Sequence, residues 1–276
     1  MTYWNAALLG LVQGLAEFLP ISSSGHLAVL QNFLAIGDME NHMLFDVLLH
    51  LGTLAAVILA FWKDVREVVT EFLRMLHIRG TPRGLRPNRR ERRLISFLIL
   101  ATLPLIPAAF LSNVVESLYQ NTFFIGFAFV MTGFLLFAAD RMGHGNKDER
   151  SSTSADAIVV GLAQAVAVVP GLSRSGTTIS AGMLRGFERS FAVKFSFLLS
   201  IPAVVGANLV SIIKVFSTGV EWSYVPMYLV GVACAFVSGY FAIYFLRLIV
   251  QRGKFGGFCY YCWGAGLVTL LLSLIS

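Results

Sequence analysis

The sequence predicts an all-α polytopic membrane protein built from two inverted repeats, each a re-entrant helix-loop-helix followed by three transmembrane helices. The first observation is composition: the 276 residues are 57% hydrophobic and 13% charged, with a mean hydropathy of +0.74. This exceeds what a soluble core requires. The second is that the apolar runs are long and nearly continuous, whereas the strands of a membrane barrel alternate apolar and polar residues. We therefore expect one helical membrane domain over residues 1–276.

The third observation is a segment that occurs twice, about half a chain apart. Seven identical residues coincide when the N-terminal segment is shifted by 151 positions. The coinciding pairs are Gly10 and Gly161, Leu11 and Leu162, Gln13 and Gln164, Ala16 and Ala167, Ser22 and Ser173, Ser24 and Ser175, and Gly25 and Gly176. Membrane proteins with broken helices are often built from such repeats. The match predicts one repeat over about 1–139 and a second over about 155–276.

Each repeat begins with apolar pieces that are too short to cross about 30 Å of hydrocarbon. Residues 4–19 form a predicted helix that Pro20 ends, Ser22 to Gly25 form a loop, and a second short helix covers 26–36. In the second repeat the corresponding parts are a helix over 155–169, a loop over 170–178 and a helix from Ile179. Irregular backbone survives at membrane depth only inside protein or beside a cavity, so we expect two re-entrant hairpins.

Three predicted spans follow each hairpin. They cover 43–62, 94–112 and 122–139 in the first repeat, and about 195–214, 225–246 and 257–276 in the second. Three crossings leave the chain on the side of the membrane opposite to the one where it started, so the second repeat should be inverted. The two hairpin tips should then meet near the midplane.

The basic residues predict the orientation. Nineteen of the 21 Lys and Arg residues fall in four segments that this topology places on one side, 63–93, 140–154, 185–194 and 247–254. An excess of Lys and Arg marks the cytoplasmic side, so both termini should lie outside. The segment 63–93, with ten basic residues, is the predicted cytoplasmic loop. We expect its Arg-rich part, 79–93, to lie against the anionic lipid of the bilayer and not against nucleic acid.

The second tip has the composition of a phosphate site. Arg174 lies within an otherwise apolar region, and an ionisable residue at membrane depth indicates function. Its neighbours are small hydroxyl residues and glycine, which suit an oxyanion. The predicted phosphate ligands of this tip are Ser173, Ser175, Gly176 and Thr178. A guanidinium fork beside them favours phosphate.

The first tip supplies acid-base groups. Gln13 and Glu17 are four residues apart and share a helix face, so they are candidate ligands for a divalent cation that substrate phosphate completes. Ser22, Ser24 and Gly25 precede a helix N-terminus, which favours phosphate. His26 lies at the same terminus, where a neutral imidazole can take a proton from Ser23 or from water.

Two other polar groups have simpler interpretations. Asp46 and His50 are also four residues apart, and we favour a structural role for this pair over a supporting role in the site. Cys259 and Cys262 lie at helical spacing in an apolar segment, and we interpret them as packing residues.

The two tips together resemble a known family. Gln13 and Glu17, the stretch from Pro20 to His26 and the stretch from Pro170 to Thr178 are similar to the two signature regions of the bacterial undecaprenyl-diphosphatase family associated with bacitracin resistance. The resemblance covers the whole chain. It implies an inner-membrane enzyme that hydrolyses undecaprenyl diphosphate to undecaprenyl phosphate and so recycles the lipid carrier of cell-wall synthesis. It also implies Mg²⁺ or Ca²⁺ as cofactor.

Mapped onto this sequence, the resemblance implies Glu17, Ser23, His26 and Arg174 as catalytic residues, with Gln13 and Glu17 at the metal. The first position of the acidic pair is often Glu, and Gln13 cannot ionise. Either Ser23 attacks phosphorus directly or His26 activates a water, and we favour the serine. We also expect a homodimer. The alternative is a translocase that moves a phosphorylated polyprenyl lipid without cleaving it, because inverted repeats are the layout of transporters.

Overall fold

The computed structural model describes residues 1–33, 43–76, 88–218 and 222–274, and its regular structure over these ranges is helical. The helices of the first half are α1 (Tyr3–Phe18), α2 (Ser23–Phe33), α3 (Met43–Ala60), α4 (Trp62–Met75), α5 (Arg89–Thr102), α6 (Leu105–Ala109), α7 (Ser112–Tyr119) and α8 (Thr122–Met142). Those of the second half are α9 (Ser154–Val166), α10 (Arg174–Leu184), α11 (Arg189–Thr218), η2 (Trp222–Tyr224), α12 (Val225–Gln251), η3 (Phe255–Gly257) and α13 (Phe258–Leu272).

Five helical segments are long and apolar enough to cross a membrane. They are Arg89–Ala109, Thr122–Met142, Arg189–Ile213, Trp222–Gln251 and Phe255–Leu272. A sixth is obtained if Leu44–Ala60 and Trp62–Met75, which meet at a bend of 91°, are counted as one broken span. The chain is therefore a polytopic, multi-pass membrane protein.

The bend between α3 and α4 differs from the prediction of an unbroken helix over 43–62 followed by a loop over 63–93. A new helix, α4, begins at Trp62 and covers the predicted loop as far as Met75, and α5 already begins at Arg89. The sequence of α4 explains this, because Val65, Val68 and Phe72 recur at helical spacing and form one apolar face beside charged residues. The helix predicted over 94–112 is also interrupted, at Pro104 between α5 and α6.

Both hairpin tips are shorter than predicted because a serine caps each second helix. α2 begins at Ser23 instead of 26, and α10 begins at Arg174 instead of 179. The Ser22 hydroxyl accepts the Gly25 N–H at 3.3 Å, and the Ser173 hydroxyl accepts the Gly176 N–H at 3.0 Å. Serine at this position satisfies one of the free N–H groups of a helix start.

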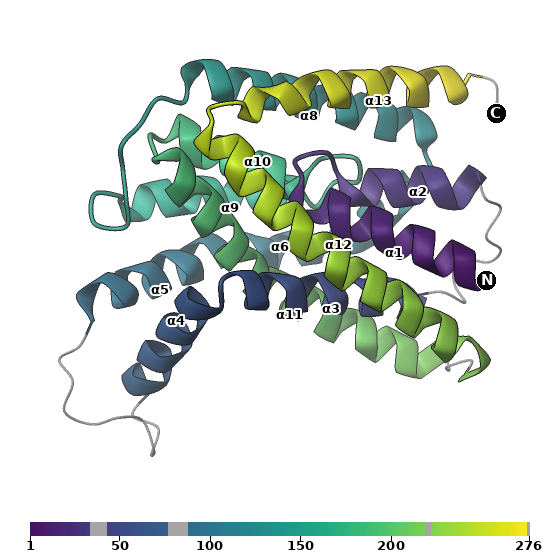
Figure 1. Cartoon of the computed structure of the whole chain (residues 1–276), viewed down its shortest axis with the longest axis horizontal. Coiled ribbons are helices and arrows are strands. Elements are labelled where there is room, and N and C mark those ends of the chain that lie inside the picture. Colours follow the sequence, from purple (N-terminus) through teal and green to yellow (C-terminus); the bar gives the residue numbers. More distant parts are fainter. Residues whose placement is uncertain (34–42, 77–87, 219–221, 275–276) are drawn as a thin grey trace.

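The helices of the two halves are interleaved. α1 packs along α12, α9 packs along α5, and α8 lies beside α13 (Figure 1). The close contact of α1 with α12 depends on glycine: a Cβ atom added to Gly10 would lie 2.1 Å from the carbonyl oxygen of Gly231. Aromatic side chains fill the core around the end of α1, and the ring of Phe197 in α11 contacts the rings of Phe18 and Phe61 at centroid distances of 5.5 and 5.6 Å.

A buried carboxylate ties the start of α9 to its surroundings. Asp156 is fully buried and accepts hydrogen bonds from Lys147 Nζ at 2.9 Å and Arg185 Nε at 2.8 Å. It also forms a capping box with Thr153. Burial alone would raise the pKa of Asp156, but the hydrogen bonds from Lys147, Thr153 and Arg185 outweigh it and lower the pKa from 3.8 to about 2.

Candidate functional site

The two hairpin tips meet, as the repeat predicts. The Ser22 hydroxyl donates to the carbonyl oxygen of Leu172, and the N–H of Gly171 donates to the Ser24 hydroxyl, each at 3.3 Å. In the other direction the Ser175 hydroxyl donates to the carbonyl oxygen of Leu19, also at 3.3 Å. These bonds hold the start of α2 against the start of α10, so residues 150 positions apart form one site.

Unusual backbone conformations help to shape both tips. Ser22 has a φ of +71°, which a residue with a side chain rarely adopts, and Gly171 has a φ of +87°. Within each tip the capping serine also contacts the serine two residues later in the sequence. The Oγ–Oγ distance is 3.3 Å for Ser22 and Ser24, and 3.2 Å for Ser173 and Ser175. Most tip hydroxyls are thus committed to holding the backbone in place.

Glu17 is the centre of the site. Its side chain is only 9% exposed, and one carboxylate oxygen is paired with Arg174 Nη2. The other oxygen accepts hydrogen bonds from Ser23 Oγ at 2.7 Å and from Gln13 Nε2 at 3.1 Å. A buried carboxylate is stable only when it is paired and hydrogen-bonded in this way. The ion pair joins the last turn of α1 to the first turn of α10.

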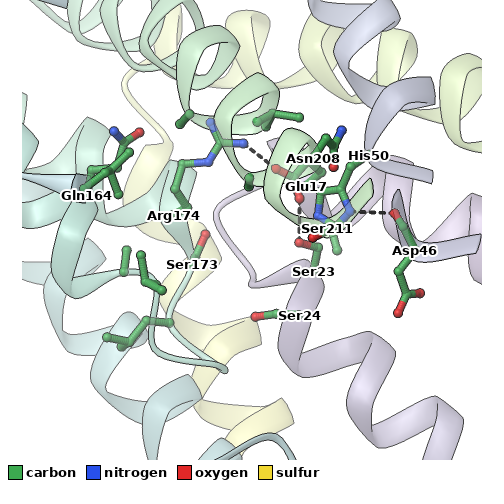
Figure 2. Close-up of a pocket in the computed structure, with 18 of the residues that line it drawn as sticks. Glu17, Ser23, Ser24, Asp46, His50, Gln164, Ser173, Arg174, Asn208 and Ser211 are labelled. Atoms are coloured by element: carbon green, nitrogen blue, oxygen red, sulfur yellow. Dashed lines mark hydrogen bonds and ion pairs between the residues drawn. The ribbon is translucent and has the colours of Figure 1, made fainter. Parts of the chain in front are cut away.

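This cluster lies in the wall of a cavity of about 470 Å³ (Figure 2). The apolar part of the wall comes mainly from α11 and from the segment between α9 and α10, and it consists of Ala16, Val47, Leu105, Ala167, Val168, Leu172, Ala203, Val204 and Ala207. The polar side chains in the wall are Glu17, Ser23, Ser24, Asp46, His50, Tyr119, Gln164, Ser173, Arg174, Asn208 and Ser211. A concave site with a few convergent polar groups is the usual form of a binding site.

The cavity contains some of the predicted site residues and not others. Glu17, Ser23, Ser24, Ser173 and Arg174 line it. Gln13, Ser22, Gly25, Ser175, Gly176 and Thr178 do not. The hydroxyl of Thr178, for example, is buried and contacts Ser196 Oγ at 2.6 Å. Ser22, Gly25, Ser175, Gly176 and Thr178 support the backbone of the tips, and Gln13 joins the site through its hydrogen bond to Glu17.

His26 also lies outside the cavity lining. Its Nδ1 donates to the carbonyl oxygen of Ser22 at 2.7 Å, which leaves Nε2 to accept a hydrogen bond from the Tyr261 hydroxyl, also at 2.7 Å. The imidazole packs edge-on against Phe129, with ring centroids 5.0 Å apart. The structure therefore pairs the Ser23 hydroxyl with Glu17, and it does not bring His26 to Ser23 as a base.

The imidazole that does line the cavity is that of His50. Its Nδ1 donates to the carbonyl oxygen of Asp46 at 2.8 Å, and Figure 2 places the ring beside Glu17 and Ser23. The sequence alone favours a structural role for Asp46 and His50. Gln164 and Asn208 were not among the predicted site residues. A signal for Gln164 was present, because the repeat aligns it with Gln13.

The donor set of the site suits a divalent cation that the substrate helps to bind. Among the described residues no three His, Cys, Asp or Glu side chains cluster to hold a metal ion. One suitable oxygen is present, because Gln13 Oε1 is buried and makes no hydrogen bond with the described part of the chain. Mg²⁺ commonly binds through one or two carboxylates together with substrate phosphates. Glu17 and Gln13 fit a cation of that kind, and they do not form a complete protein cage.

The cysteines have packing contacts. Cys259 and Cys262 are buried, and Cys262 Sγ donates to the carbonyl oxygen of Pro20 at 3.4 Å. Cys262 thus contacts the backbone of the first hairpin tip, between α1 and α2.

Comparison with known proteins identifies the family of the chain. A family model described as bacitracin resistance protein BacA matches residues 6–268. Among curated proteins, the chain is similar to the undecaprenyl-diphosphatase of Alkaliphilus metalliredigens, with 41% identity over the full length of both chains. It is 38% identical to the undecaprenyl-diphosphatase of Halothermothrix orenii over 99% of each chain. It is 41% identical to that of Syntrophotalea carbinolica over 99% of this chain and 100% of the relative. The chain therefore belongs to the BacA family of bacitracin resistance proteins.

Proposed function

We propose that this protein is a membrane hydrolase that converts undecaprenyl diphosphate into undecaprenyl phosphate and inorganic phosphate, and so recycles the lipid carrier of the cell wall. The observation that carries the proposal is the arrangement of Arg174, Glu17 and Ser23 in one membrane-protein cavity. The curated relatives are named for this activity. Nothing in the site favours the translocase alternative, since a nucleophile aligned with a carboxylate serves cleavage and is not needed for binding.

The cluster suits phosphoryl transfer, in which positioning and charge stabilisation supply most of the catalysis. Arg174 uses one nitrogen for Glu17, and Nη1 has no hydrogen bond with the described residues, so it is available to a phosphate oxygen. Ser23 donates to Glu17 and is therefore aligned to lose its proton to that carboxylate.

In the reaction we propose, Ser23 Oγ bonds to the distal phosphorus while the bond from that phosphorus to the bridging oxygen breaks. The serine proton passes to Glu17, and undecaprenyl phosphate leaves. Water then cleaves the phosphoserine, releases inorganic phosphate, and Ser23 recovers a proton. In the alternative, Glu17 activates a water that attacks the same phosphorus. His26 is a positioning residue in this scheme, because both ring nitrogens are engaged away from Ser23.

We further propose that Mg²⁺ or Ca²⁺ accompanies the substrate. Glu17 and Gln13 Oε1 are the residues that would hold it. A bound cation would neutralise the negative charge of the diphosphate.

For the architecture we propose a single membrane domain of two inverted repeats, about 1–139 and 155–276, each starting with a re-entrant hairpin. The helix contacts support it. The contact of α1 with α12 has a counterpart in that of α9 with α5, and the contact of α3 with α12 has one in that of α11 with α5. The aligned glycines agree: a Cβ on Gly10 would meet Gly231, and one on Gly161 would lie 2.4 Å from the carbonyl oxygen of Ala101.

We place the protein in the bacterial inner membrane with both termini outside and the segment 63–93 in the cytoplasm. In Figure 1 the start of α1 and the end of α13 lie at the same edge of the molecule, and the start of α5 lies at the opposite edge. That opposite edge carries the basic segment that begins α5. We also propose that the protein forms a homodimer.

The test is phosphate release from a C55 prenyl diphosphate by the purified protein in detergent, with and without Mg²⁺ or Ca²⁺. We expect cation-dependent release that Arg174→Ala abolishes. As a matched control, Arg66→Ala removes an exposed guanidinium on α4 and should leave release unchanged. Lipid binding without any phosphate release by folded protein would overturn the hydrolase proposal.

A further inference from the structure

Two amide side chains in the cavity wall have unused hydrogen-bonding capacity. Gln164 is 2% exposed, and neither its Oε1 nor its Nε2 has a hydrogen-bond partner among the described residues. Asn208 is 6% exposed, and its Nδ2 likewise has no partner in the described part of the chain. A buried polar group left unpaired costs about 1–3 kcal/mol, so such groups indicate a missing partner.

The internal repeat explains why the Gln164 amide has no hydrogen-bond partner among the described residues. Gln13 donates to Glu17 four residues later, within the same helix. The aligned Gln164 is followed at the same spacing by Val168, which offers no acceptor. Both Gln164 and Val168 line the cavity, so the amide that is internally satisfied in the first hairpin faces a ligand space in the second. Because both amide atoms are unpaired, this holds whichever way the amide is turned.

The two amides lie on opposite sides of the Glu17–Arg174 pair in Figure 2, Gln164 from α9 and Asn208 from α11. Arg174 lies between them in Figure 2, and its Nη1 is the third N–H group without a partner among the described residues. Three N–H donors around one cavity suit a ligand rich in acceptor oxygens. The carboxylates of the cavity wall are those of Glu17 and Asp46. Glu17, which lies between the two amides in Figure 2, already has partners for both of its oxygens.

We infer that the side-chain amides of Gln164 and Asn208 bind the diphosphate group of the lipid substrate from opposite sides, together with Arg174 Nη1. This rests on the proposed function, since it specifies how that site holds its substrate. Uncharged donors suit this part of the cavity wall. They can donate hydrogen bonds to phosphate oxygens, but they do not form an ion pair with Glu17 that would close the cavity.

The test uses near-isosteric apolar variants of the full-length protein, Gln164→Met and Asn208→Leu. Each removes an N–H donor to a charged oxygen, so we expect KM for the C55 diphosphate to rise about tenfold or more in each variant. The inhibition constant for inorganic pyrophosphate should rise in parallel, while kcat falls less. Thermal stability in detergent should be unchanged or higher, because an unpaired buried amide has been replaced by an apolar group. Gln251→Met, at an exposed position, is the matched control.

Direct binding separates this inference from the proposed function. The probe is a C55 methylene-diphosphonate, which cannot be hydrolysed, and its affinity should fall about tenfold in both variants even if the wild-type protein releases no phosphate. Absence of release by the wild type would overturn the hydrolase proposal alone. Probe affinity and KM within twofold of wild type in both variants would overturn the inference. So would a loss of thermal stability that accounts for the weaker binding.

Discussion

The Ser23 hydroxyl donates a 2.7 Å hydrogen bond to the carboxylate of Glu17, whose other oxygen is paired with Arg174 on the opposite hairpin. One carboxylate thus holds two side chains that are 151 residues apart in the sequence. In the mechanism that we propose, Ser23 is the nucleophile and Arg174 binds the phosphate, so the chemistry should depend most on Glu17.

The first prediction concerns Glu17→Gln. The amide keeps the size of the side chain but cannot take the Ser23 proton, and it leaves Arg174 without its countercharge. We expect the rate of phosphate release to fall at least about 100-fold, since positioned acid-base groups typically contribute that much or more. The measurement is kcat with C55 diphosphate in detergent. Glu67→Gln, at an exposed position of α4, is the control and should keep wild-type activity. A Glu17→Gln enzyme within tenfold of wild type would remove the carboxylate from the mechanism.

The second prediction identifies the nucleophile. If Ser23 attacks phosphorus, enzyme quenched with acid during turnover of substrate labelled in the distal phosphate should carry the label on Ser23. Ser23→Ala should lose the label and at least about 1000-fold in rate. Ser24→Ala loses a hydroxyl that accepts from the Gly171 N–H and contacts Ser22 Oγ, and it should keep the label. Turnover without labelled enzyme, and a Ser23→Ala rate within tenfold of wild type, would instead identify water as the attacking group.

The third prediction tests the role of His26. Because its two ring nitrogens bond to Ser22 and Tyr261, we expect His26→Ala to lower thermal stability and phosphate release together. The lost hydrogen bonds correspond to about 1–3 kcal/mol of unfolding free energy. Tyr261→Phe removes only the hydroxyl and should change the rate less than about threefold. A His26→Ala protein that melts like the wild type but is inactive would show that the imidazole takes part in the chemistry.

The membrane class and the meeting of the tips were predictable because they depend on composition and on local signals, namely long apolar runs and Ser-Gly segments after a proline. Other features depend on packing between distant elements. The bend after Ala60 is one such feature, because α4 turns away to lay its apolar face against α5. The choice between His26 and His50 is another. Both lie on predicted helices, but only the packed structure turns His50 toward Glu17 and His26 toward Tyr261.

The fourth prediction concerns the glycine contact between α1 and α12. A methyl group at Gly10 would lie 2.1 Å from the Gly231 carbonyl oxygen, so Gly10→Ala must push the two helices apart. Overpacking of this kind costs about 1–3 kcal/mol. Gly264→Ala is the control, because a Cβ atom there meets nothing within 4 Å and alanine favours the helix. We expect a lower melting temperature in detergent for the first variant and an unchanged or higher one for the second. Equal melting temperatures would contradict this packing.

The fifth prediction concerns Asp156, whose pKa is lowered from 3.8 to about 2 by its hydrogen bonds to Lys147, Thr153 and Arg185. A group with a lowered pKa stabilises the folded state above its unfolded value and loses that contribution as the pH falls through its folded value. The stabilisation should therefore be constant above about pH 4 and decline between about pH 4 and pH 2. Asp156→Asn removes the charge, so the variant should be less stable than wild type at neutral pH by about 1–3 kcal/mol. The difference between the two proteins should shrink as the pH is lowered toward 2. Unfolding midpoints measured in detergent across this range test the prediction, and a stability difference that does not vary with pH would contradict it.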